Sequence, residues 1–221
     1  MTTMTTGQVL AFWAMLHAAP LAFITRLGAP ARFVHLLLSL AVCSFAIRLM
    51  IDANIGASPW DVFHIGLSRW LPITVGQASI VAGIAVVTVA WLGFREKYGL
   101  GTLLNVLEIG LLIDVLAPFT PHPTHLPAQW GQFLLGVLLA GFGTAAYISA
   151  GFGAGPRDGL MMALHRQYGW PIARIRTSLE VGILLLGALL GGPVGPGTLV
   201  FALLMGPSVG AGLRLFGFRK Q

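Results

Sequence analysis

The sequence predicts an all-α polytopic membrane protein with about six transmembrane helices in two inverted three-helix repeats. Three observations lead to this fold class. Apolar residues make up 56% of the 221-residue chain and charged residues only 9%, against about 25% charged residues in an ordinary soluble domain. Apolar runs long enough to cross a bilayer recur along the chain. A short motif in the first half of the chain also reappears in the second half.

Six apolar runs come close to the roughly 20 residues that a helix needs to cross a bilayer. They cover residues 33–54, 77–94, 101–118, 130–151, 175–191 and 197–216. We assign residues 33–118 to a first repeat and residues 130–217 to a second, within one membrane domain. This leaves no room for an appreciable soluble domain.

Residues 1–32 form an apolar N-terminal extension. Pro20 interrupts its apolar stretch and no Lys or Arg precedes it, which argues against a secretory signal with a basic start. An interfacial helix is favoured here. A seventh crossing, or a tail upstream of a later start such as Met15, remains open.

The positions of the basic residues indicate the membrane topology of the chain, not a nucleic-acid partner. The chain carries a formal charge of +6. Apart from Arg48 and Arg69, its basic residues fall on alternate connections or at the ends of the adjoining apolar runs: Arg26, Arg32, Arg95, Lys97, Arg157, Arg166, Arg174, Arg176, Arg214, Arg219 and Lys220. The other connections hold Arg69 alone. The positive-inside rule then predicts that the start of the first crossing and the C-terminus lie in the cytoplasm, and we expect no nucleic-acid partner.

The composition also limits the chemistry that we expect. A single cysteine, Cys43, excludes disulfides within the chain and thiolate metal clusters. His122 and His125 have no Cys or carboxylate beside them in their loop, so a plain polar loop is favoured over half of a metal site. No HExxH motif is present, and we find no pairing of a nucleophile with a base. We therefore expect no enzyme activity, no cofactor and no metal.

The repeated motif is GASPWDV from Gly56 and GAGPRDG from Gly153, 97 positions apart. After a slip of one residue, GLGTLLNVLEIG from Gly99 matches GPGTLVFALLMG from Gly195. Each motif has the pattern of a helix start, with Ser58 or Gly155 as the cap, a proline in the first position and an acid in the first turn. The sequence therefore predicts short helices over 59–70 and 156–168.

These two helices would each be only about 18–20 Å long, too short to cross a bilayer. They must be interfacial or re-entrant, and broken backbone at membrane depth needs protein or a watery cavity around it. With three crossings in each half, the second repeat enters the membrane from the opposite side. Inverted repeats with broken helices at their interface are typical of secondary transporters.

Asp61 and Asp158 have two interpretations. As acids in the first turn of a helix, each can simply complement the helix dipole, worth about 0.3–1 kcal/mol. Alternatively, the two helix starts form the walls of a polar site. Both roles are compatible in one residue.

Charged and polar residues inside the apolar runs need partners. Arg48 with Asp52, and Arg176 with Glu180, are four residues apart and can form local pairs.

Glu108 has no basic residue within four positions. Thr102, Asn105 and Glu108 form a polar stripe, interpreted as a hydrated pathway, with polar contacts between helices as the alternative. The stretch Gly206, Pro207 and Ser208 is expected to break the last helix, with a simple kink as the alternative.

The GASPWDV start, the GTxxNxxxIGxxxD stretch from Gly101, and GAGPRDGLM followed by RIRTSLEV together resemble the bacterial YczE membrane proteins of the broader YitT and YyaS group. The resemblance covers about residues 34–213 and implies a small polytopic inner-membrane protein. It transfers no residue roles. Ala57, Ser58 and the N-terminal extension depart from the family pattern.

The leading functional hypothesis is a transporter-like permease or exporter of a small solute. Its site would lie between the repeats, lined by Asp61, Thr102, Asn105, Glu108, Arg157, Asp158 and Glu180. The alternative is a non-transporting membrane scaffold or regulatory partner that uses its basic cytoplasmic face. The expected partners are the lipid bilayer and a small solute, and a homo-oligomer or a protein partner stays open.

Overall fold

The computed structural model describes residues 28–153 and 155–216, and within these ranges the chain is helical with no strand. The predicted interfacial helix in the N-terminal extension lies outside the described residues. The helices are α2 (Ala29–Asp52), α3 (Pro59–Trp70), α4 (Val75–Phe94), α5 (Leu100–Leu116), the 3-10 turn η1 (Ala117–Phe119), α6 (Leu126–Ser149), α7 (Pro156–Tyr168), α8 (Ile172–Leu189) and α9 (Pro196–Leu215). The predicted all-α class is confirmed.

Five helices in the described part of the chain are long and apolar enough to cross a membrane: α2, α4, α5 together with η1, α6 and α9. Helix α8 differs because its 18 residues include Arg174, Arg176 and Glu180. The sixth predicted crossing at residues 175–191 therefore stays a prediction.

The two short helices have the predicted bounds and starts. In α3, the Ser58 hydroxyl accepts a hydrogen bond from the Asp61 amide at 3.2 Å, and Pro59 occupies the first position, which needs no amide donor. In α7, Gly155 takes the cap position and Pro156 follows it. Gly169 ends α7 in the left-handed conformation that glycine adopts without strain.

Helices α2 and α6 pack against each other in opposite directions. Gly136 of α6 approaches Met50 of α2, and Gly143 of α6 approaches Cys43 of α2, so the contacts run in reverse order along the two helices. Small residues at these points let the two backbones come close. Helices α2 and α6, which are separated by the repeat offset of 97 positions, are therefore antiparallel.

Hydrogen bonds between α2 and α6 also occur as equivalent pairs. His35 contacts the Ala146 carbonyl through Nε2 at 3.0 Å, and Gln132 donates from Nε2 to the Leu49 carbonyl at 3.0 Å. Residues 35 and 132, and residues 49 and 146, are each 97 positions apart. Each half therefore makes the same contact to the other half.

The loops before the short helices repeat this reciprocity. The Gly101 amide, at the start of α5, donates to the Phe152 carbonyl at 2.9 Å, and the Gly197 amide, at the start of α9, donates to the Ile55 carbonyl at 2.8 Å. Each loop thus pairs with a helix start in the other half.

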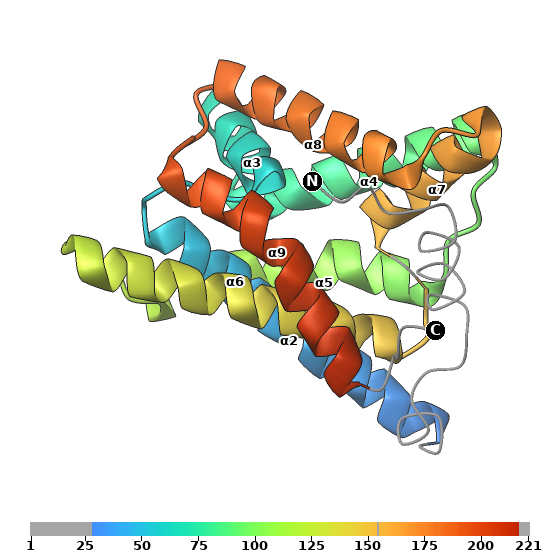
Figure 1. Ribbon diagram of the computed structural model, residues 1–221, viewed down its shortest axis with the longest axis horizontal. Helices are drawn as coiled ribbons and strands as arrows, with labels where there is room; N and C mark the ends of the chain where they lie inside the picture. Colours follow the sequence, from blue (N-terminus) through green and yellow to red (C-terminus); the bar gives the residue numbers. More distant parts are fainter. Residues whose placement is uncertain (1–27, 154, 217–221) are drawn as a thin grey trace.

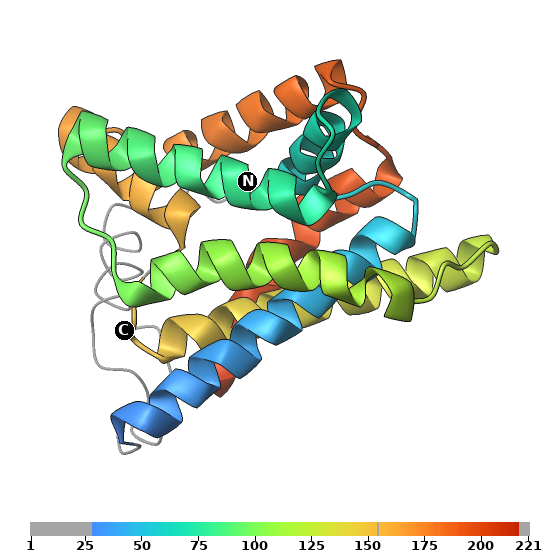
Figure 2. The same cartoon turned by 180° about the vertical axis from the view of Figure 1, so that it is seen from behind.

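Each short helix also packs on a helix of the other half. Helix α3 packs on α8, while α7 packs on α4. Arg69 of α3 donates to the Gly191 carbonyl just beyond α8, whereas Arg166 of α7 forms an ion pair with Glu96 just beyond α4. Figures 1 and 2 show α4 and α8 along one side of the bundle and α2 with α6 along the opposite side.

The predicted break at Gly206, Pro207 and Ser208 is wrong. Helix α9 continues through Pro207 to Leu215. Ser208 packs against Gly141 of α6, and its hydroxyl donates to the Leu138 carbonyl at 3.2 Å. Contacts from a neighbouring helix allow a transmembrane helix to keep its course through a proline.

Alanine substitutions at the two loop glycines, Gly56 and Gly153, should destabilise the protein by different amounts. Both Gly56 and Gly153 have φ of +117°, which strains any residue with a Cβ atom. At Gly56 the added Cβ would also lie 2.8 Å from the Thr198 hydroxyl and 2.9 Å from the Thr198 amide, whereas at Gly153 the nearest atom is 3.5 Å away.

We expect Gly153→Ala to lower the free energy of unfolding by about 1–3 kcal/mol, and Gly56→Ala to lower it by more. Detergent-titrated unfolding in mixed micelles, read by tryptophan fluorescence, measures both. Gly93→Ala is the control, because that glycine lies in α4 with no atom within 4 Å of the added Cβ. Equal losses at Gly56 and Gly153 would contradict the Thr198 contact.

Candidate functional site

A cavity of about 240 Å³ lies between the starts of the two short helices. Each of the α-helices α2 to α9 contributes to its lining. The starts of α3 and α7 supply most of the ionisable groups, and the remaining helices supply mainly apolar side chains. The cavity is therefore where the contacts between the two halves converge.

Trp60 and Arg157 meet at the centre of this arrangement. They occupy equivalent positions in the repeated motif, and the Arg157 guanidinium carbon lies 4.3 Å from the centre of the Trp60 ring. This is a cation–π contact. Arg157 lines the cavity, and its side chain is exposed there.

The start of α3 is closed by its own side chains. The Ser58 hydroxyl donates to the Asp61 carboxylate while it caps the Asp61 amide. His64, one turn further along, places Nδ1 3.5 Å from Asp61 Oδ1. Burial lowers the pKa of His64, so the imidazole is neutral at neutral pH, although Asp61 acts in the opposite direction.

The start of α7 is open by comparison. Gly155 offers no side chain to cap the helix. The Asp158 carboxylate instead accepts a hydrogen bond from the Tyr147 hydroxyl of α6 at 3.3 Å. Burial raises the pKa of Asp158, while Arg176 and Arg157 hold it down.

An ion pair borders the cavity on α8. Arg176 Nε lies 3.0 Å from Glu180 Oε1, and the two side chains are 49% and 34% exposed. The predicted local pair is confirmed. These two charges cancel near the cavity's more accessible edge.

The structure gathers most of the predicted site residues around this one cavity. Asp61, Asn105, Arg157, Asp158 and Glu180 line it. Their functional roles stay a prediction, since geometry alone does not test them.

Thr102 and Glu108 lie outside the cavity lining. Thr102 is buried beside Gly153, in the loop that precedes α7. Glu108 keeps one buried carboxylate oxygen that makes no hydrogen bond to any described residue.

The sequence interpretation missed His64, Tyr147 and Arg176 as lining residues. For His64 a signal exists, because it lies three positions after Asp61 and therefore shares its helix face. Tyr147 lies in an apolar run, and Arg176 was interpreted as part of a local pair, so only the packing of α6 and α8 shows that they line the cavity.

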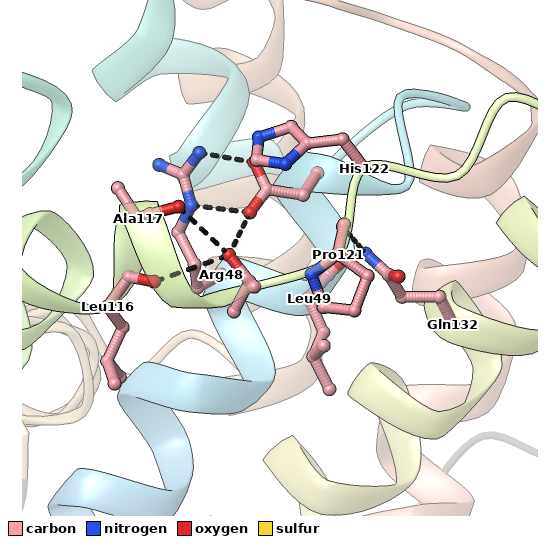
Figure 3. Close-up of polar contacts among 9 residues, drawn as sticks. Arg48, Leu49, Leu116, Ala117, Pro121, His122 and Gln132 are labelled. Atoms are coloured by element: carbon pink, nitrogen blue, oxygen red, sulfur yellow. Dashed lines mark hydrogen bonds and ion pairs between the residues drawn. The ribbon is translucent and has the colours of Figure 1, made fainter.

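A second polar cluster lies at the end of α2, away from the cavity (Figure 3). Asp52 accepts hydrogen bonds from Arg48 and from the Thr120 hydroxyl, and His122 Nε2 lies 3.3 Å from Asp52 Oδ1. Gln132 of α6 donates to the carbonyls of Leu49 and Pro121. The predicted Arg48 and Asp52 pair is confirmed, and it also anchors the loop between α5 and α6.

Among residues 28–153 and 155–216, no three His, Cys, Asp or Glu side chains come close enough together to hold a metal ion.

Comparison with known proteins gives the chain its relatives. A family described as a family of unknown function, DUF6198, matches residues 30–213. The chain is 38% identical over 176 residues to the "uncharacterized membrane protein YczE" of Bacillus subtilis, covering 79% of this chain and 82% of that protein. It is 38% identical over 174 residues to an "uncharacterized protein" of Haemophilus influenzae, covering 79% of each chain.

A more distant relative is the "uncharacterized protein YyaS" of Bacillus subtilis, 26% identical over 178 residues, which cover 79% of this chain and 89% of that protein. The resemblance to the YczE and YyaS proteins is confirmed. No solved structure matches the chain.

Substitution of Asp52 should lower the free energy of unfolding substantially. In Asp52→Ala the Arg48 guanidinium, whose side chain is only 14% exposed, loses its ion-pair partner. A half-buried charge left alone costs about 3–5 kcal/mol of unfolding free energy, measured by detergent-titrated unfolding. Glu180→Ala is the control, because its exposed pair contributes about 1 kcal/mol or less. Similar losses in both variants would show that the Asp52 cluster is not a special anchor.

Proposed function

The chain belongs to the DUF6198 family, and from that premise we propose that it is a transporter-like permease or exporter of a small polar solute. Its binding site is the cavity between the two halves. It acts in the bacterial cytoplasmic membrane with its C-terminus in the cytoplasm, and it carries out no chemical reaction on the solute.

One observation carries this proposal: a partly polar cavity lies at the starts of two short helices, and helices of both halves line it. Secondary transporters commonly bind solutes at the repeat interface, where helix N-termini face the substrate. The cavity is also small. At about 30 Å³ per water molecule, 240 Å³ corresponds to roughly eight waters, so the solute is a small one.

The arrangement as inverted repeats is part of the proposal. The antiparallel packing of α2 on α6 supports it, and so does the exchange of equivalent contacts between the halves. Reciprocal contacts of this kind are the signature of a two-fold relation. If α2 crosses in one direction, its equivalent α6 crosses in the other.

The proposal also counts α8 as the sixth crossing. It is the equivalent of α4, and its 18 residues extend about 27 Å, close to the thickness of the hydrocarbon core. Two of its three charged residues form a pair with each other.

The scaffold alternative relies on free basic side chains at the cytoplasmic face. Arg166 pairs with Glu96 and is not free. Arg174 is exposed. No cavity is needed for such a role, so we keep it as the outcome to be adopted if solute flux is absent.

The sidedness of the short helices tests the inverted repeat. Trp70 and Gln167 are equivalent, exposed positions at the ends of α3 and α7. In a Cys43→Ala background, we expect Trp70→Cys to react with a membrane-impermeant thiol reagent in intact cells, and Gln167→Cys to react only after lysis. Labelling of both from the same side would contradict the inverted arrangement.

Solute flux tests the function itself. Ser79 lines the cavity from α4, whereas Ile84 of the same helix is 52% exposed on the outer surface. We expect Ser79→Phe to fill the cavity and to reduce flux in proteoliposomes by at least about tenfold, since an added aromatic ring excludes the solute.

Ile84→Phe is the matched control and should transport as the unaltered protein does. A panel of small radiolabelled anions, cations and neutral solutes provides the assay. If no solute in the panel crosses faster than in protein-free liposomes, the transporter proposal is wrong and the scaffold role takes its place.

A further inference from the structure

The polar groups of the cavity are unevenly satisfied. Its carboxylates have partners: Asp61 accepts from Ser58, Asp158 from Tyr147 and Glu180 from Arg176. Its hydrogen-bond donors have fewer partners. In the described part of the chain, Arg157 makes no hydrogen bond and no ion pair within 4 Å, and its close contact is the Trp60 ring.

A guanidinium stacked on an aromatic ring leaves its N–H donors free at its edge, because the ring occupies only one face. Those edge donors match the two oxygens of a carboxylate in a bidentate pair. Arg157 is thus held in position by Trp60 and has unused donors within the cavity.

The start of α7 adds further donors. Its cap Gly155 makes no side-chain hydrogen bond, and no described acceptor pairs with the backbone amides of Arg157 and Asp158. At the equivalent point in α3, Ser58 caps the helix. An uncapped helix N-terminus attracts anions through its amides and its dipole.

A buried side chain supplies an independent observation. His64 lines the cavity and is 2% exposed. Its Nδ1 atom lies 3.5 Å from Asp61 Oδ1 but makes no hydrogen bond to a described residue. It lies within electrostatic range of Arg157. A buried polar atom without a hydrogen bond costs free energy unless a ligand or water supplies one. A ligand in the same cavity can supply it.

We propose that the cavity binds the carboxylate group of a small monoanionic solute, held between the Arg157 guanidinium and the open N-terminus of α7. This inference rests on the proposed function, since it names the ligand class of the same cavity.

The charges of the site favour a monoanion over a dianion. Arg176 and Glu180 cancel, which leaves Asp61 and Asp158 against Arg157. Because one negative charge is in excess, a dianion such as phosphate would be repelled more strongly than a carboxylate. Asp158, next to Arg157 in the same helix turn, is the acid that opposes the bound anion.

Equilibrium binding in lipid nanodiscs, followed by isothermal titration calorimetry, tests the inference. The probes are propionate, its neutral analogue propionamide and the cation propylammonium, at equal ionic strength. We expect propionate to bind at least about tenfold more tightly than the other two, because charge-assisted hydrogen bonds are the strong ones.

Variants at the site should shift propionate affinity in opposite directions. Arg157→Gln should weaken binding roughly 10- to 100-fold, whereas Asp158→Asn should strengthen it on the order of tenfold because a like charge is removed. A cationic ligand would reverse both signs. Arg174→Gln is the control, since Arg174 is exposed on α8 and outside the cavity lining.

Gly155→Ser tests the open helix start without removing a charge. Gly155 has φ of −64°, and the nearest atom to an added Cβ is the Tyr147 hydroxyl at 3.2 Å, so a serine fits with a small shift of that side chain. The new hydroxyl would cap α7 as Ser58 caps α3. We expect a stable protein with propionate binding weakened about tenfold.

The outcomes separate this inference from the transport proposal. Propionate binding with the expected changes, but with no flux of propionate or of any other panel solute in proteoliposomes, would support the inference and overturn transport. Flux of other solutes that Ser79→Phe blocks, with no propionate binding, would overturn the inference and leave transport standing. Preference for propylammonium, or unchanged affinity in both Arg157→Gln and Gly155→Ser, would also overturn the inference.

Discussion

The structure depends on satisfying backbone groups where the chain leaves its helices inside an apolar protein. The loops before α3 and α7 carry the carbonyl groups of Ile55, which is buried, and of Phe152, which is half-buried, and a buried carbonyl without a partner would cost several kcal/mol. The Ile55 carbonyl is paired by the Gly197 amide and the Phe152 carbonyl by the Gly101 amide. Because each loop pairs in the opposite half, the short helices are held where the two halves meet.

The two halves share a scaffold and differ in chemistry. Ser58 in the first half and Gly155 in the second occupy the same cap position, so one helix start is closed and the other is open. Trp60 and Arg157 occupy the next equivalent pair and contact each other across the cavity. A two-fold arrangement makes equivalent residues near its axis neighbours, so a single substitution in one half can create a contact of unlike side chains.

Much of the fold could be predicted because its signals are local. Pro59 with Ser58, and Pro156 with Gly155, determine where the short helices begin, and apolar length locates the long helices to within a few residues. The predicted break at Pro207 was wrong because the neighbouring α6 supports that helix through Ser208, a contact absent from the local sequence.

The site was predicted only in part because helix orientation is not local. Helix α5 is apolar almost all round, so its sequence does not reveal which side faces the interior. Asn105 reaches the cavity but Glu108, three residues later, does not line it. Tyr147 enters the site because α6 packs against α2. The packing of helices from both halves, which no single segment encodes, decides these positions.

The exchange of loop contacts has a consequence for how the protein is made. The Ile55 carbonyl finds its partner only when Gly197 has been synthesised, about 140 residues later, which takes roughly 7–28 s at typical elongation rates of about 5–20 residues per second. During that interval the first half has emerged from the ribosome with its loop still unpaired. Until the last helix is inserted, the Ile55 carbonyl must therefore be paired by the insertion machinery or by transient water.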